Sequence, residues 1–276
     1  MQVKHGKVRA EGAQLYYETR GEGRPVLIIQ GGLSEAGATQ QLAEALACDH
    51  QVITYDRRGL SRSAVAEDTA PVTIATHADD VATLLSSVTV EPAYVVGASI
   101  GALIALHFAV RHPDRVATLV AHEPPMATVV LDAEREAALD EIAALAREDV
   151  RAAIGRMASL TRAGQGSAEE GARPASAVGD LDANLGWFFT HDFPAVRTSE
   201  LDSGQIATAA RSTTIVLTGG QESRGQWEYR CAEQLAGKIG RPFVELPGGH
   251  GALVSHPRAV ADRLKSLFAG AEVRET

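Results

Sequence analysis

A serine flanked by two glycines, at the junction of an apolar run and a helical run, constrains this chain more than any other feature. Residues 93–98 are apolar, Ser99 follows, and residues 100–107 continue as an apolar helical segment. A strand that turns directly into a helix needs small residues two positions before and after the serine. Gly97 and Gly101 occupy those positions. The pattern predicts a strained turn that lifts the Ser99 hydroxyl to a helix N-terminus, where free N–H groups favour developing negative charge.

Strands and helices are expected to alternate through most of the remaining chain. Residues 8–17 alternate polar and apolar positions, which favours an antiparallel hairpin. The runs 26–29, 116–121 and 214–217 are almost entirely apolar, a composition typical of strands buried on both faces. Helical spacing separates such runs, as in residues 74–87, and a helix is also expected over residues 36–47. This rhythm predicts an α/β fold with a parallel sheet built from right-handed crossovers.

The alternation is interrupted in the middle of the chain. Residues 132–147 and 149–160 are rich in Ala, Glu and Arg and favour helices, whereas residues 163–178 are rich in Gly, Ser and Ala and indicate a mobile connection. The insertion is expected to lie over the C-terminal edge of the sheet, where open α/β sheets hold their sites. The expected organisation is a core domain of residues 1–125 and 212–276 with a helical insertion of residues 126–211.

Four motifs, taken in their order, resemble those of the α/β-hydrolase fold. They are Gln30-Gly31-Gly32, Asp56-Arg57-Arg58-Gly59, Gly97-Ala98-Ser99-Ile100-Gly101 and Gly248-Gly249-His250. The resemblance covers essentially the whole chain and implies a mostly parallel central sheet flanked by helices, with a helical cap inserted after the sixth strand. It also implies a catalytic triad in the chain order nucleophile, acid and histidine.

Ser99 is the expected nucleophile and His250 its expected base. A serine hydroxyl at its free pKa is a poor nucleophile and needs a base within hydrogen-bond reach. Among the nine histidines, His250 lies in a glycine-rich loop directly after the last expected strand. A side chain in that loop can reach the sheet edge and act as general base.

Two glutamates remain candidates for the acid that orients His250. Relatives of this fold often place the acid after the seventh strand, where Glu222 is the nearest carboxylate and the usual aspartate is absent. Others, such as the haloalkane-dehalogenase branch, place it directly after the sixth strand, where Glu123 stands. The two prolines after Glu123 suit a rigid orienting role. Glu123 is therefore preferred, and Glu222 stays open.

The resemblance also implies an oxyanion hole made of two main-chain N–H groups. One belongs to Ile100, directly after the nucleophile, and the other to the early glycine turn, where Gly32 is preferred over Leu33. Gln30 stands where the family usually has histidine. This departure changes the hydrogen bonding that braces the turn and the polarity of the pocket, while the main-chain donors are expected to survive.

A serine nucleophile points to acyl transfer. Epoxide hydrolases and haloalkane dehalogenases of this fold attack with a carboxylate, so their mechanism is not expected here. The sequence predicts a cofactor-independent hydrolase that cleaves a carboxylic ester, thioester or lactone through an acyl-enzyme on Ser99. The alternatives are an acyltransferase or lyase of the same fold, or a ligand-binding protein with slow turnover. The expected substrate is a small apolar or aromatic acyl compound, and the candidate pocket residues are Gln30, Met126, Trp187, Phe188, Phe189 and Phe193.

Charge and cysteine usage argue against several other classes of function. The net charge of −9 disfavours nucleic acid or an anionic membrane as partner. No apolar run is long enough to span a bilayer, and the first residues lack the apolar core of a signal peptide. Cys48 and Cys231 lack metal-ligand spacing, and the early glycine turn lacks a dinucleotide-binding pattern, so neither metal nor cofactor is expected. The chain is expected to be cytoplasmic, as a monomer or homodimer.

Overall fold

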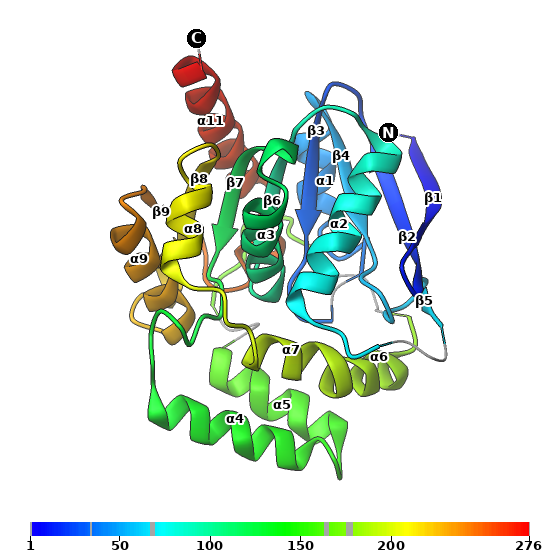
Figure 1. The fold of residues 1–276 in the computed structure, drawn as a ribbon, viewed down its shortest axis with the longest axis vertical. Coiled ribbons are helices and arrows are strands. Elements are labelled where there is room, and N and C mark those ends of the chain that lie inside the picture. The colour runs from blue at the N-terminus through cyan, green and yellow to red at the C-terminus, as the bar shows by residue number, and fades with distance from the viewer. Residues whose placement is uncertain (1, 34, 67–69, 163–165, 175–178, 276) are drawn as a thin grey trace.

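The computed structural model describes residues 2–33, 35–66, 70–162, 166–174 and 179–275, with side chains up to residue 270. In these residues, nine strands form one sheet (Figure 1). The strands are β1 (Val3–Ala10), β2 (Ala13–Arg20), β3 (Arg24–Ile29), β4 (His50–Tyr55), β5 (Ala64–Val65), β6 (Ala93–Ala98), β7 (Val116–His122), β8 (Thr214–Gly220) and β9 (Phe243–Leu246).

Most of this sheet is parallel. The strands lie in the order β1-β2-β4-β3-β6-β7-β8-β9, and β5 pairs with β2. The pairs that β2 makes with β1, β4 and β5 are antiparallel, and every pair from β4–β3 to β8–β9 is parallel. The carboxyl ends of the parallel strands therefore meet at one edge. The predicted α/β architecture is confirmed; the short β5 lies outside the sequence prediction, so the strands expected as sixth and seventh are β7 and β8.

Helices cover both faces of the sheet (Figure 1). One face carries α2 (Ile74–Val88), α3 (Ile100–Arg111), α8 (Ser203–Ala209) and α9 (Trp227–Ile239), and the other carries α1 (Gln40–Leu46), α10 (Ala252–Ser255) and α11 (Pro257–Glu275). Alternate residues of β3 enter the two cores, with Leu27 and Ile29 on one side and Val26 and Ile28 on the other. Short 3-10 turns follow α3 and β8, at η1 (Pro113–Arg115) and η3 (Gln221–Ser223).

The helix predicted over residues 36–47 begins later, at Gln40. The residues before it form turns, and the N–H of Ala36 donates to the carboxylate of Asp56 (2.7 Å). Gly37 in this stretch also disfavours a helix. The other predicted helices are present.

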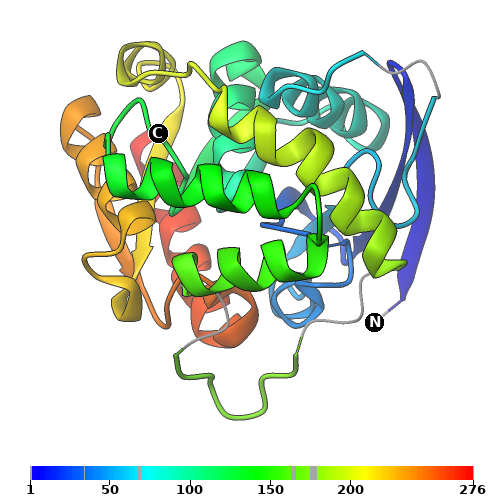
Figure 2. The ribbon, with the colours of Figure 1, turned by 90° about the horizontal axis from the view of Figure 1, so that it is seen from below.

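Between β7 and β8 the described residues form helices that lie across the carboxyl edge of the sheet (Figures 1 and 2). These are α4 (Ala133–Leu145), α5 (Val150–Thr161), α6 (Leu181–Trp187), the π-helical segment η2 (Phe188–Asp192) and α7 (Phe193–Arg197). The side chains of Asp132 and Asp149 accept hydrogen bonds from the first turns of α4 and α5, and so start both helices. The helices share an apolar cluster of their own, whereas α8 packs on α3 and α9.

The connection predicted over residues 163–178 lies partly outside the described residues, at 163–165 and 175–178. The stretch 166–174 has neither helix nor strand, and the side chain of Gln41 in α1 hydrogen-bonds to it. In the described ranges of the chain, no helix combines the length and apolarity that crossing a membrane requires.

The turn between β6 and α3 has the strained geometry that the sequence predicts. Ser99 has φ 54° and ψ −127°, a conformation that residues other than glycine rarely adopt. A Cβ built at Gly101 would lie 2.1 Å from the carbonyl oxygen of Ile29, and one built at Gly97 would lie 2.4 Å from that of Gly101. The two glycines therefore let β3, β6 and α3 approach more closely than any side chain would permit.

Gly101→Ala is expected to lower the free energy of unfolding by about 1–3 kcal/mol, because the new methyl group forces β3 and α3 apart. Gly237→Ala is the matched control, since Gly237 also lies in a helix and a Cβ there would have no neighbour within 4 Å. The control is expected to be neutral or stabilising by up to about 1 kcal/mol. Urea denaturation measures both, and unchanged stability of Gly101→Ala would contradict the close approach.

Candidate active site

Ser99 stands at the carboxyl edge of the sheet, between β6 and the first turn of α3. Its N–H donates to the carbonyl oxygen of His122 at the end of β7 (2.9 Å), which fixes the turn to the neighbouring strand. The residue is partly exposed, and it lines the same cavity as His250. Because Ser99 directly precedes α3, the free N–H groups of that helix end lie close to the hydroxyl.

His250 is held by a glutamate from a neighbouring strand end. It lies in the loop after β9, and its Nδ1 donates to Oε2 of Glu123 (2.6 Å). Glu123 directly follows β7, is fully buried, and has φ 50°, a left-handed conformation at the point where the chain leaves the strand. With Nδ1 bonded to Glu123, Nε2 of the imidazole is left for a second partner.

The carboxylate of Glu123 accepts three hydrogen bonds. Besides His250, the N–H of Gly220 (2.8 Å) and the hydroxyl of Ser223 donate to its Oε1. Burial by itself raises the pKa of Glu123, but the hydrogen bonds and the positive charge of nearby histidines outweigh it and lower that pKa to about 2. Burial lowers the pKa of His250, but the hydrogen bond with Glu123 and the negative charges of Glu228 and Glu123 together outweigh it and raise that pKa above its usual value. The pair therefore combines a stable anion with an imidazole that protonates readily.

Glu222, the alternative acid, is directed elsewhere. Its exposed carboxylate accepts hydrogen bonds from the N–H (2.9 Å) and the hydroxyl of Ser167. The next residue, Ser223, is the one whose hydroxyl reaches Glu123. The loop after β8 thus supplies donors to the Glu123 carboxylate, and the structure brings Glu123, not Glu222, to His250.

The glycine turn after β3 packs against the candidate nucleophile. A Cβ built at Gly31 would lie 3.1 Å from Cβ of Ser99, so turn and serine are in direct contact. Gly32 has φ 49°, where glycine is favoured. Gln30 is buried, and its Nε2 donates to Oγ1 of Thr39 (3.2 Å), which braces the turn. The main-chain N–H groups that remain candidates for an oxyanion hole are those of Gly32, Leu33 and Ile100.

Ser99 and His250 open into a cavity of about 320 Å³ at the sheet edge. Residues of the core and of α4, α5, η2 and α7 share its wall. The apolar lining includes Leu139, Ile154, Met157, Phe188, Phe193, Val196, Trp227 and Leu253. A cavity of this size and composition suits a small organic ligand.

Three of the six predicted pocket residues line this cavity, namely Gln30, Phe188 and Phe193. The other three point elsewhere, which corrects the prediction. Met126 packs in the core, Trp187 lies against Gly59, and Phe189 packs edge-on against Phe188 (5.2 Å between centroids). Consecutive helical residues point about 100° apart, so an uninterrupted aromatic cluster cannot face one cavity as a whole.

The cavity wall also carries a buried ion pair that the sequence analysis does not single out. Arg135 of α4 donates from Nη2 to the carboxylate of Glu228 in α9, and its guanidinium lies 4.2 Å from the ring centroid of Trp227. The two charged side chains are 9% and 3% exposed. After burial and the hydrogen bond with Glu123, the negative charge of Glu228 is a further influence that raises the pKa of His250. Only the fold brings Arg135 inward, since charged residues surround it along α4.

No metal-binding cluster of three or more His, Cys, Asp or Glu residues occurs in the part of the chain that the structure describes. Cys48 is exposed and Cys231 is buried, and both are free thiols.

Comparison with known proteins identifies the fold. A family model described as the alpha/beta hydrolase fold matches residues 24–275. The uncharacterized hydrolase YraK of Bacillus subtilis is 31% identical over 270 residues, which are 97% of this chain and 97% of YraK. A thermophilic esterase from Thermogutta terrifontis superposes with a TM-score of 0.76 and 20% identity, over 97% of this chain and 99% of the esterase. The N-acyl homoserine lactone degrading enzyme Est816 superposes with a TM-score of 0.69 and 20% identity, over 95% and 99% of the two chains.

Proposed function

Because the chain belongs to the alpha/beta hydrolase fold family, we propose that it is a cofactor-independent serine hydrolase that cleaves a carboxylic ester, thioester or lactone. The observation that carries this proposal is the hydrogen bond between His250 and Glu123, at a cavity that Ser99 and His250 share. A serine, a carboxylate and a histidine in this chain order are the components of a catalytic triad in this fold.

In the proposed mechanism, Ser99 Oγ attacks the carbonyl carbon of the substrate while His250 Nε2 takes the hydroxyl proton. Glu123 holds Nδ1 and stabilises the imidazolium. The tetrahedral oxyanion accepts hydrogen bonds from the N–H of Ile100 and from the glycine turn. Its collapse expels the leaving group, which takes the proton from His250. Water then gives a proton to His250 and attacks the acyl-enzyme. Collapse of the second tetrahedral intermediate releases the acid, and His250 returns the proton to Ser99 Oγ.

The helices over the sheet edge act as a cap in this proposal. Side chains from α4, α5, η2 and α7 close the cavity opposite Ser99, and most of those side chains are apolar. The size and the apolar wall of the cavity support a small apolar or aromatic acyl group as substrate. Restricted access of water behind such a cap would favour transfer to another acceptor, which is the acyltransferase alternative.

A fluorophosphonate probe tests the activated serine. Intact-mass measurement and peptide mapping are expected to show one label per chain, on Ser99, and no label in Ser99→Ala. Labelled protein justifies a screen of short-chain and aromatic esters, lactones and thioesters. A folded, unlabelled wild-type protein would contradict the proposal and favour a ligand-binding role, to be pursued with compounds that raise Tm.

A further inference from the structure

A buried aspartate in the helices over the site is not used by the proposed mechanism. Asp192 ends the π-helical segment η2 and is fully buried. Both carboxylate oxygens accept hydrogen bonds from the core, Oδ2 from Nη2 of Arg57 and Oδ1 from Nε2 of His77, each at 3.0 Å. A π-helical insertion in an α-helix is frequently found at a functional site. This one places a charge from the cap helices in the core domain.

Arg57 connects that charge to the glycine turn beside Ser99. Its guanidinium is 1% exposed, and it donates from Nη1 to the carbonyl oxygen of Gln30 (3.0 Å) and from Nη2 to that of Gly32. The planar guanidinium suits this task, because its donors point in fixed directions. One side chain therefore holds two carbonyl groups of the turn and the Asp192 carboxylate at once.

These two carbonyl groups control the directions of the candidate oxyanion donors. A peptide unit is planar and trans, so a fixed C=O also fixes the N–H of the following residue. The carbonyl of Gly32 shares its plane with the N–H of Leu33. The carbonyls of Gln30 and Gly32 belong to the peptide units on either side of the unit that carries the Gly32 N–H. Arg57 thus restrains both candidate donors in the turn.

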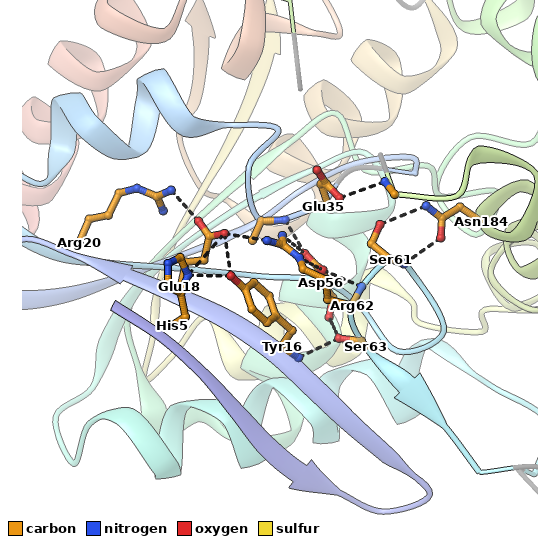
Figure 3. Close-up of polar contacts among 12 residues, drawn as sticks. His5, Tyr16, Glu18, Arg20, Glu35, Asp56, Ser61, Arg62, Ser63 and Asn184 are labelled. Carbon is orange, nitrogen blue, oxygen red and sulfur yellow. Dashed lines mark hydrogen bonds and ion pairs between the residues drawn. The ribbon is translucent and has the colours of Figure 1, made fainter. Parts of the chain in front are cut away.

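A second contact between the same loop and the same helices offers a comparison. Ser61 donates its N–H to Oδ1 of Asn184 in α6 (2.8 Å), and Asn184 Nδ2 donates to the Ser61 hydroxyl (3.1 Å) (Figure 3). Figure 3 also shows Arg62 of this loop donating hydrogen bonds to Asp56 and to Glu18 of β2. Among the described residues, Asn184 forms no hydrogen bond with Arg57 or the glycine turn. Its substitution therefore weakens the anchoring of the helix and leaves the hydrogen bonds of the turn in place.

We propose that Asp192 is a positioning residue that, through Arg57, holds the glycine turn in its oxyanion-binding geometry. The cap helices therefore set the efficiency of the chemical step and not only the shape of the substrate pocket. This inference rests on the proposed function, since it concerns the oxyanion hole of that same site.

The test compares Asp192→Ala, Asp192→Asn and Arg57→Lys with Asn184→Ala. With a short-chain p-nitrophenyl ester, kcat of Asp192→Ala is expected to fall about 10- to 100-fold with KM little changed, because the donors are misplaced by a fraction of an ångström. Asp192→Asn keeps the shape of the side chain and is expected to show a smaller loss of kcat than Asp192→Ala. Asn184→Ala is expected to lower Tm while kcat stays within about twofold of wild type.

The double variant Arg57→Lys/Asp192→Ala distinguishes positioning from stability. If both residues act through the same turn, the double variant is expected to be no slower than Arg57→Lys alone. Should Asp192→Ala fail to fold, Asp192→Asn and Arg57→Lys carry the same comparison. An unchanged kcat in the Asp192 variants would overturn this inference, and so would a loss of kcat in Asn184→Ala as large as that in Asp192→Ala. The proposed function would still stand if the probe labelled Ser99 of the wild-type protein. A wild-type protein that is not labelled would overturn both.

Discussion

Glu123→Gln is expected to lower kcat for ester hydrolysis about 10⁴-fold with little change in KM. An amide in place of the Glu123 carboxylate cannot stabilise the imidazolium of His250, and an amide N–H facing Nδ1 favours the wrong tautomer. KM is expected to stay close to the wild-type value, because Glu123 is fully buried behind His250 and is not among the residues that line the cavity. Steady-state kinetics with a good ester substrate measure both constants.

The pH dependence of kcat/KM gives the same prediction a second readout. His250 must be neutral to accept the proton from Ser99, so the rate is expected to rise with pH through the pKa of His250. That pKa is raised above the usual value, because the hydrogen bond with Glu123 and the negative charges of Glu228 and Glu123 together outweigh the effect of burial. Glu123→Gln removes the carboxylate, so the residual activity is expected to persist to lower pH.

Glu222→Gln is the matched control for this prediction. Glu222 lies two residues after the end of the parallel ladder of β8 with β9, in the loop where many relatives place the acid, yet its carboxylate bonds to Ser167 on the surface. The control is expected to retain kcat within about twofold. A large loss in Glu222→Gln, with Glu123→Gln left active, would contradict the assignment of the acid.

The features that the sequence predicts well are those that local sterics or periodicity decide. A strand, a serine and a helix can meet this closely only if the residues two positions before and after the serine are small. Gly97 and Gly101 meet this requirement, so the turn at Ser99 can be predicted without knowledge of the fold. Apolar runs such as 26–29 are long and uniform enough to place the central strands of the sheet. The order of these elements then predicts a mostly parallel sheet, which the structure and the family match confirm.

The choice between the two glutamates depends on contacts across the sheet. Glu123 reaches His250 because it adopts φ 50° at the end of β7 and because Gly220 and Ser223, about a hundred residues later, donate to it. No local pattern contains this information. The sequence predicts two positions for the acid, and the structure brings one of them, Glu123, into contact with His250.

The pocket is the least predictable part of the site. Aromatic residues at 187–193 are adjacent in sequence, but the helix directs them to different sides, and the π-helical segment shifts the register that a period of 3.6 residues would assign. The charged residue Arg135 shows the opposite problem. It follows a helix cap among other charged residues, and only the fold, which brings Glu228 of α9 beside it, turns it inward.

Removal of one partner of the Arg135–Glu228 pair is expected to cause the largest loss of stability. Glu228→Leu leaves the guanidinium of Arg135 buried without its carboxylate, which is expected to lower the free energy of unfolding by about 3–5 kcal/mol. Arg135→Met is expected to cost a similar amount, because it leaves the Glu228 carboxylate unpaired. Urea denaturation at pH 7 measures each variant.

The double variant Arg135→Met/Glu228→Leu tests whether the ion pair contributes to the stability of the fold. Without either charge, no desolvation cost remains, so the double variant is expected to be close to wild type in stability and far more stable than either single variant. If it is as unstable as the single variants, packing of the Arg135 guanidinium on the Trp227 ring and not its pairing with Glu228 accounts for the loss. With stability restored, the loss of the Glu228 charge, which raises the pKa of His250, outweighs the loss of the opposing Arg135 charge, so that pKa is still expected to fall and activity to extend to lower pH. If the double variant is stable but its pH profile is changed, the Arg135–Glu228 pair contributes more to the pKa of His250, the candidate base, than to the stability of the fold.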